Sequence, residues 1–234
     1  NNLRKPMPAG SGGFVATDDD GLADSLRAYR DRMPARGAVS RLGHRIESYL
    51  HARLLGPRTY WPLFWLHRAA TGTYRTSPLR DQIASEMEST RYRVARHQYA
   101  AGLAWLERLP ALAAHRRDCG RRYLEALGGL SDVETPAAAG GDPLYFFPVL
   151  VRDKPTLLRR ARARSLEIVA WPVTTPIYPV EDPSVLGSYG YELGSCPVAE
   201  DVAGRLVGLP TDLRTRTGHL EAIIALVKEH GATV

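Results

Sequence analysis

The residue in this sequence best suited to covalent chemistry is Lys5, which stands just ahead of a loop rich in glycine and proline. The loop contains Gly10, Gly12 and Gly13, and glycine lets a backbone take positive φ angles and approach a ligand closely. A lysine beside such a loop can lose water and charge partners, and its uncharged amine is then a nucleophile suited to a Schiff base. These residues alone also allow the alternative of a solvated lysine in an ordinary turn.

The elements that must position this loop follow it directly in the chain. Residues 13–17 are an apolar, β-branched run, which predicts a strand. Asp18–Asp20 then supplies an N-cap and negative charge, both favourable at the start of a helix. The predicted helix has one apolar face, made by Leu22, Leu26, Tyr29 and Met33.

An aromatic stretch, Tyr60–Leu66, lies in the middle of the chain. Three interpretations stay open for it: burial in a core or dimer interface, which we favour, a shallow contact with a membrane surface, or part of a substrate pocket. The run is too short to span a bilayer. Arg58 and Arg68 flank it and keep a surface contact with a membrane in consideration.

Helical periodicity dominates the next part of the sequence. Leu79–Glu107 is the longest predicted helix, and Pro110 is expected to kink or restart it before a second segment, Ala111–Leu127. A turn-rich linker, Gly128–Pro143, follows. Because this linker contains both proline and paired glycines, it predicts a boundary between a helical region and the rest of the chain.

Strands and helices alternate after the linker, as in a small α+β domain. The apolar runs Leu144–Val151, Ile168–Trp171 and Leu206–Leu209 predict strands. Further helices are predicted from Asp153, which serves as an N-cap, to Arg164, from Val198 to Arg205, and from Thr215 to Glu229 with Gly231 as its C′ residue.

Composition narrows the class of protein. The 234 residues are 44% hydrophobic and 24% charged, with a net charge of +6 that arginine carries. Basic charge permits an anionic partner, but no zinc-finger, RRM or basic-zipper pattern accompanies it, so we expect no nucleic acid. Cys119 and Cys196 match no metal spacing, so we expect no metal and a reducing cytoplasm. No signal peptide or transmembrane segment is expected.

Three motifs resemble one known family. The Lys-x-Met-x-x-Gly-Ser-Gly-Gly run, Lys5–Gly13, resembles the lysine loop of the DegT/DnrJ/StrS-type sugar aminotransferases, and Thr17 matches the end of the strand that follows. Arg116–Leu127 is similar to the family's Arg-Arg…Tyr…Leu helix. Cys196–Glu200 and Val207–Pro210 are similar to its P-x-A-E…L-x-L-P signature. The family consists of pyridoxal-phosphate (PLP) enzymes with the aspartate-aminotransferase fold, fold type I.

The resemblance implies an α/β fold, namely the C-terminal portion of a fold-type I aminotransferase. Residues 1–78 would be the end of the large PLP-binding domain, with an aromatic insertion at about 36–78. Residues 79–128 would be the long linking helices, and residues 129–234 the small C-terminal α+β domain. The chain starts without methionine inside the lysine motif, so we expect that an upstream part is missing.

The resemblance also implies the activity: PLP-dependent transamination of a nucleotide-linked keto-sugar, with glutamate as the usual amino donor, in polysaccharide, cell-envelope or secondary-metabolite sugar biosynthesis. Lys5 would form the internal aldimine and shuttle the proton. Asn2 and Gly12 would lie against the cofactor, and the family's active sites between subunits imply a homodimer. Arg91 would reach the cofactor phosphate of the partner subunit, where the family often has an asparagine.

Two departures from the family's motifs favour an alternative to the aminotransferase activity. Arg91 stands where the family often has Asn-x-Arg-Met, and Thr211-Asp212 replaces the usual His-Pro. The aspartate, the aromatic ring and most of the phosphate cup that bind PLP in the family lie upstream of the lysine. The alternative is therefore a degenerate, non-catalytic paralogue, or a truncated fragment that acts as an interaction module. A sugar dehydratase is less favoured, since such relatives replace the lysine.

Overall fold

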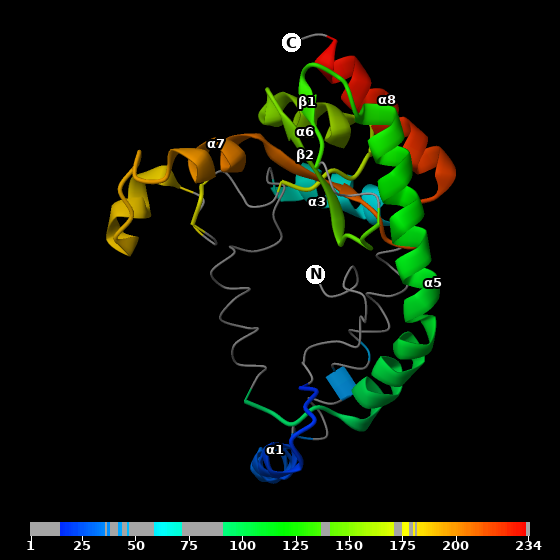
Figure 1. Ribbon diagram of the computed structural model, residues 1–234, viewed down its shortest axis with the longest axis vertical. Helices are drawn as coiled ribbons and strands as arrows, with labels where there is room; N and C mark the ends of the chain where they lie inside the picture. Colours follow the sequence, from blue (N-terminus) through cyan, green and yellow to red (C-terminus); the bar gives the residue numbers. More distant parts are fainter. Residues whose placement is uncertain are drawn as a thin grey trace. The chain divides into compact units, whose positions relative to one another are not determined.

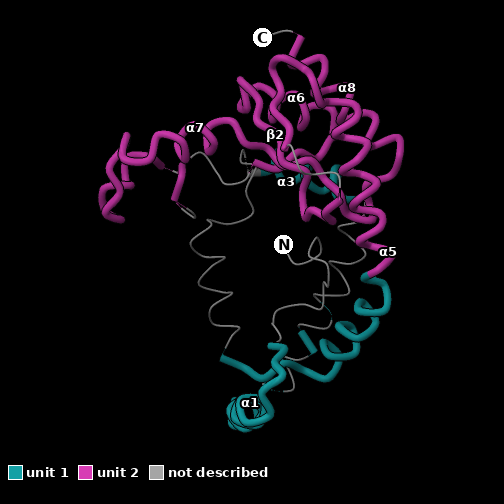
Figure 2. Tube along the Cα trace, in the orientation of Figure 1, with its two compact units in different colours: residues 1–109 teal, residues 110–234 magenta. Residues whose placement is uncertain are grey.

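The computed structural model describes residues 15–35, 37, 42, 43, 46, 59–71, 91–136, 141–170, 175–177, 180 and 182–232 (Figure 1). The chain divides into two compact units, residues 1–109 and 110–234, which Figure 2 colours separately. In the part of the chain that the structure describes, no helix is both long enough and apolar enough to cross a membrane.

The first described helix, α1 (Asp20–Arg32), begins where the acidic cap predicts it. Asp19 Oδ1 accepts a hydrogen bond of 2.9 Å from the Leu22 N–H, which satisfies one of the open donors of the first turn. Residues 15–17, however, are irregular, so the predicted strand is wrong over the part that is described. The Thr17 hydroxyl accepts from the Asp19 N–H at 3.1 Å, and this local turn leads the chain straight into the cap.

The aromatic stretch forms a helix, α3 (Tyr60–Thr71). Its rings stack one turn apart: Tyr60 on Phe64 with centroids 6.0 Å apart, and Trp61 on Trp65 at 6.4 Å. The Arg68 guanidinium lies 5.3 Å from the Trp65 ring centroid, as a cation–π pair. Leu66 remains 67% exposed, so the helix presents apolar surface as well as stacked rings.

A 32-residue helix, α5 (Arg96–Leu127), is the longest element of the described chain. It begins at Arg96, so the prediction of a helix from Leu79 is wrong at residues 91–95, which are not helical. Ala95 ends the non-helical run because its N–H donates to Gln98 Oε1 at 2.8 Å, one half of a capping box. Pro110 lies inside the helix and does not end it, and the boundary between the two units falls there.

The second unit is built on a three-stranded antiparallel sheet of β1 (Val133–Glu134), β2 (Phe146–Val151) and β3 (Leu206–Pro210), in that order. Phe147 pairs with Leu209 and Val149 with Val207. In residues 168–170, the described part of the predicted strand Ile168–Trp171, pairing is reduced to a single bridge, in which Val169 exchanges both backbone hydrogen bonds with Gly208.

Helices cover the apolar face of this sheet (Figure 1). They are the end of α5, α6 (Lys154–Ala163) and α8 (Thr217–Gly231); α7 (Pro197–Arg205) precedes β3, and a 3-10 helix, η2, spans Pro183–Tyr189. Alternate residues of β2 are buried, as expected for a strand with one covered face. The largest fully buried side chains of this core are Tyr123, Leu127, Phe147, Val149, Val151, Leu157, Leu209, Leu220, Ile223 and Leu226.

The helix ends in this unit follow the sequence closely. Asp153 Oδ1 accepts from the Thr156 N–H at 3.0 Å and caps α6, as predicted. Gly231 is the last residue of α8 and not its C′ residue, because the right-handed Ala232 forms the cap. The prediction for Gly231 is therefore wrong by two positions, within the ordinary fraying of a helix end.

Candidate functional site

Three of the four residues predicted to serve the cofactor lie outside the described residues. These are Lys5, Asn2 and Gly12, whose roles remain predictions. The fourth, Arg91, is described: it is exposed and belongs to the turn that leads into α5. Two residues on, the Arg93 N–H donates to the Pro34 carbonyl at 3.0 Å, which ties this turn to the end of α1.

The chain holds three lysines, so few amines could bind an aldehyde covalently. Lys228 is exposed on α8. Lys154, in contrast, is only 3% exposed, and burial lowers its pKa. A reactive lysine needs a lowered pKa, because only the uncharged amine is a nucleophile. Sequence analysis missed Lys154 because no pattern in the neighbouring sequence indicates that it is buried. Its Nζ donates to the Ala203 carbonyl at 2.7 Å, near the end of α7, which is a structural contact.

Two of the sequence motifs meet through one hydrogen bond. Tyr123 of the Arg-Arg…Tyr…Leu helix is fully buried, and its hydroxyl donates to the carbonyl of Pro210, in the Leu-Pro signature, at 3.1 Å. Arg116, about two turns earlier, is 3% exposed and stacks over the Tyr145 ring at 5.3 Å. The motifs therefore hold α5 against the end of β3.

The Pro-Val-Ala-Glu motif also has a structural role. Glu200 Oε1 accepts two hydrogen bonds of 2.7 Å, one from the Tyr191 hydroxyl and one from the Gly194 N–H. The Tyr191 bond, followed by the Gly194 bond, lowers the pKa of the Glu200 carboxyl. This glutamate thus fixes the loop before α7.

Thr211-Asp212, which stands in place of His-Pro, joins β3 to the next loop. The Thr211 hydroxyl lies 2.7 Å from the Leu144 carbonyl and 3.0 Å from that of Tyr145. Asp212 is buried, and its Oδ1 accepts from the Arg214 N–H at 2.8 Å, which forms an Asx turn. The replacement residues are therefore integrated into the fold.

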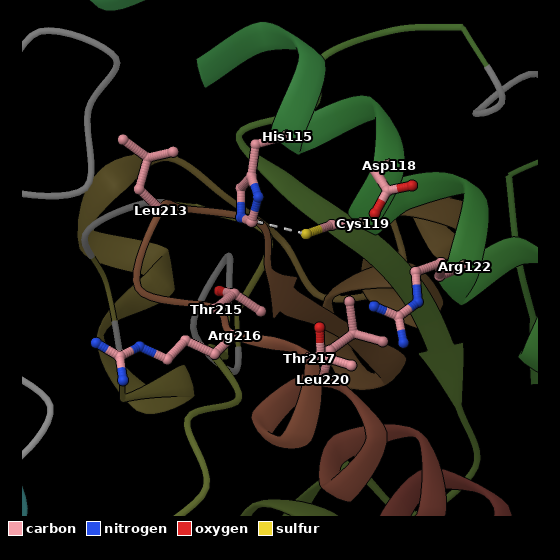
Figure 3. A pocket seen from close by; sticks show the side chains of 9 residues that line it. All are labelled: His115, Asp118, Cys119, Arg122, Leu213, Thr215, Arg216, Thr217 and Leu220. Carbon is pink, nitrogen blue, oxygen red and sulfur yellow. Dashed lines mark hydrogen bonds between the residues drawn. The ribbon is translucent and has the colours of Figure 1, made fainter. Parts of the chain in front are cut away.

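A cavity of about 280 Å³ lies between α5 and the segment that links β3 to α8 (Figure 3). All of its lining belongs to the second unit. The lining residues are His115, Asp118, Cys119, Arg122, Leu213, Thr215, Arg216, Thr217 and Leu220. Sequence analysis did not single out this cavity, because its two walls are almost a hundred residues apart in the chain.

His115 and Cys119, which line the cavity, resemble a catalytic pair but do not act as one. Cys119 Sγ lies 3.5 Å from His115 Nε2, which is also 3.0 Å from the Asp212 carbonyl oxygen. Since a carbonyl only accepts, Nε2 carries the proton and cannot take one from the thiol. Burial, with a smaller effect of Asp118, raises the pKa of Cys119 to about 11. The thiol is therefore a packing group, as the sequence predicts.

No cluster of three or more histidine, cysteine, aspartate or glutamate side chains suited to a metal ion occurs among the residues described. The predicted chemistry therefore still rests on Lys5, and Arg91 is an exposed side chain near the start of α5 whose predicted role stays a prediction.

Comparison with known proteins identifies the family. The sequence model of the DegT/DnrJ/EryC1/StrS aminotransferase family matches residues 67–228, more than half of the chain. The chain belongs to this family. The match includes the Tyr123 helix and the Leu209-Pro210 strand, and it excludes the Lys5 loop. A search of curated proteins gives no significant match.

Solved structures of aminotransferases share the fold. DesV of S. venezuelae, solved with a ketimine intermediate, and the aminotransferase TlmJ of Streptoalloteichus hindustanus each match with a TM-score of 0.51 and 23% identity, over 61% of this chain and 38% of theirs. PseC of Helicobacter pylori, an aminotransferase in pseudoaminic acid biosynthesis, matches with a TM-score of 0.50 and 17% identity, over 62% of this chain and 39% of its own.

These likenesses confirm the predicted fold class, part of a sugar-aminotransferase fold of type I. The chain spans about 38% of the length of the solved aminotransferases that it matches. At such identities the structural likeness establishes the fold alone.

Proposed function

We propose that this chain is the lysine-bearing part of a cytoplasmic, PLP-dependent aminotransferase that acts on a nucleotide-linked keto-sugar. Glutamate is the proposed amino donor, and polysaccharide, cell-envelope or secondary-metabolite sugar biosynthesis the proposed setting. The observation that carries the proposal is the aminotransferase-family match over residues 67–228. The Lys5 loop supports it, because it precedes the matched region in the order that the family resemblance implies.

The residues present are chemically suited to PLP. The cofactor has an aldehyde, which a lysine amine can bind, and a phosphate, which an arginine can bind in a forked geometry. Lys5 is the proposed amine, with Asn2 and Gly12 beside it. The described Arg91 is exposed, so its side chain can meet the phosphate of a cofactor bound in a second subunit. This role requires the homodimer that we also propose.

When bound, the cofactor supplies an electron sink for the bond that breaks at the amino-acid Cα. Lys5 would hold the cofactor covalently until the amino donor displaces its amine. The freed Nζ would then take the proton from the donor Cα and deliver it to C4′ of the cofactor. A free lysine has a pKa of about 10.4, so the site must lower the Lys5 pKa for this work near neutral pH.

Lys154 is the rival amine, and its surroundings argue against it. Its Nζ is held by the Ala203 carbonyl at 2.7 Å, and the residue is only 3% exposed. A cofactor could reach this amine only if the core opened. We therefore assign the cofactor to Lys5.

The donor half-reaction tests the proposal. The polypeptide that contains this chain, together with its upstream sequence, is loaded with PLP and mixed with glutamate, and pyridoxamine phosphate and 2-oxoglutarate are measured by liquid chromatography. We expect both products from the parent protein and from Lys228→Ala, and neither from Lys5→Ala. Products from Lys5→Ala would refute the assignment, and no product from the parent protein would favour the non-catalytic paralogue.

A further inference from the structure

The cavity of Figure 3 is bordered by the N-terminus of α8, and this helix end has no side-chain cap. The N-cap residue is Arg216, and the first turn contains no acidic residue. The open N–H groups of a first helical turn carry partial positive charge, and they attract anions. Ser, Thr, Asp and Asn are the preferred N-cap residues because their side chains accept hydrogen bonds from these N–H groups. Where such a side chain is absent beside a cavity, a ligand in the cavity can accept these hydrogen bonds.

Thr215 provides an independent observation. The residue is 3% exposed and lines the cavity between His115 and Thr217 (Figure 3). Its backbone N–H donates to the Asp212 carbonyl at 2.8 Å, but its hydroxyl makes no hydrogen bond to any residue within the described ranges. The side chain is thus held in the wall of the cavity with its hydroxyl open to it, where a ligand in the cavity can accept a hydrogen bond from it.

The charges around the cavity favour an anion. Arg216 and Arg122 lie on either side of Thr215 and Thr217 in Figure 3. Arg216 makes no ion pair with any residue of the described chain, whereas Arg122 contacts the exposed Glu221 at 3.2 Å. The lining includes one carboxylate, Asp118, and Arg121 pairs with it from outside the cavity.

We propose that this cavity binds a phosphate-class oxyanion, the phosphate or pyrophosphate group of a small molecule. The first-turn N–H groups of α8 and the hydroxyls of Thr215 and Thr217 donate to it, and Arg122 adds charge. The exposed Arg216 side chain extends away from Thr217 in Figure 3, and it turns toward the bound anion to donate as well. A volume of about 280 Å³ accommodates either group. The proposal does not depend on the aminotransferase activity.

Titration with inorganic phosphate tests the site. The full chain, in a chloride buffer of low ionic strength, is titrated while ¹H–¹⁵N spectra are recorded, and the Gly218 amide in the first turn of α8 is the reporter. We expect saturable shifts of this amide. Arg216→Gln and Thr215→Val should each weaken binding roughly tenfold, the loss expected for one charge-assisted hydrogen bond. Arg159→Gln, an exposed change of equal charge on α6, should leave the affinity unchanged.

Thr217→Asp supplies a second test that does not depend on how Thr215→Val folds. A carboxylate in the first turn satisfies the helix end from within, so this variant should lose phosphate binding and melt at a higher temperature than the parent chain. The proposal is overturned if phosphate causes no saturable shift, or if Thr215→Val, Arg216→Gln and Thr217→Asp all bind it like the parent chain.

Parallel titrations identify the source of the anion. Uridine diphosphate stands for nucleotide ligands, and pyridoxine 5′-phosphate, which has no aldehyde, stands for the cofactor. If one of these compounds binds tighter than inorganic phosphate, and Arg216→Gln weakens its binding to the same degree, that compound identifies the chemical class of the ligand. Equal affinities would limit the site to the free phosphate group. Since none of these compounds reacts with lysine, failure here leaves the Lys5 proposal intact.

Discussion

Single residues explain why the family motifs recur in this chain. Tyr123 ties α5 to β3 through the carbonyl of Pro210, and Glu200 ties the loop before α7 through Tyr191 and Gly194. Each is a buried or half-buried polar group with named partners. Loss of such a partner leaves a polar group unpaired, which costs more than the bond itself contributes.

Replacement of Tyr123 tests this role. Tyr123→Phe removes the 3.1 Å hydrogen bond and leaves the Pro210 carbonyl without this donor, while the ring still fills the core. We expect the free energy of unfolding to fall by about 1–2 kcal/mol in urea denaturation. Tyr189→Phe, at a residue 63% exposed, is the matched control and should change it by less than about 0.5 kcal/mol. Equal effects would contradict the account.

The two free cysteines should differ in reactivity. Cys196 is exposed, whereas Cys119 is 2% exposed and has a pKa raised to about 11 by burial. Because the thiolate is the reactive form, a disulfide reagent near pH 8 should modify Cys196 rapidly and Cys119 only upon unfolding. Two rapid reactions in the native protein would show that His115 activates Cys119 after all.

Among the elements, α6 ends where it is predicted to, with Arg164 as its C-cap, but in a motif that sequence analysis did not anticipate. Ser165 takes a left-handed conformation, with φ of 54°. Its N–H donates to the Arg162 carbonyl at 3.0 Å, and the Leu166 N–H donates to that of Ala161 at 2.8 Å. These are the two hydrogen bonds of a Schellman motif, with serine where glycine is usual. Leu166 and Ala161 are both buried, which completes the motif.

Two variants at this position separate backbone strain from side-chain contacts. Ser165→Gly and Ser165→Val both delete the hydroxyl, but only valine is β-branched, and it is strongly disfavoured at positive φ. We expect Ser165→Val to be less stable than Ser165→Gly by at least about 1 kcal/mol, measured as a difference in urea unfolding. Equal stabilities would mean that the left-handed geometry does not persist in solution.

Helix caps were the most predictable elements, because a cap depends on a few adjacent residues. Asp19 and Asp153 form the predicted hydrogen bonds. The start of α5 was not predictable from periodicity, because the apolar stripe continues upstream while the Gln98 side chain bonds back to Ala95. The cavity was hidden for a different reason: tertiary packing brings the α5 wall to Thr215, and no local pattern encodes that contact.

At the scale of the whole molecule, the buried His230 and the half-buried His219 should couple stability to pH. Burial lowers the pKa of His219, with a smaller opposing effect of Asp212. Burial likewise lowers that of His230, where Asp153 opposes the shift and Arg160 adds to it. The unfolded chain therefore binds more protons than the folded one between the lowered pKa values and about 6.5. In that window, stability rises with pH.

The free energy of unfolding should accordingly fall when the pH is lowered from about 7.5 to about 5.5. Urea denaturation at several pH values measures this slope, and a His219→Gln, His230→Gln double variant should have a flatter one. Carboxylates contribute little in this range, because their pKa values in the unfolded chain are near 4. An unchanged slope in the double variant would rule out these two histidines as its source.

The central claim is that Lys5 carries the cofactor, and covalent capture tests it most directly. The polypeptide with its upstream sequence is incubated with PLP, reduced with borohydride, digested and analysed by peptide mass spectrometry, so that each of the three lysines is read separately. The account predicts a phosphopyridoxyl group on Lys5, in stoichiometric amount, and none on Lys154 or Lys228. Modification of Lys154 in place of Lys5, or of no lysine, would contradict it.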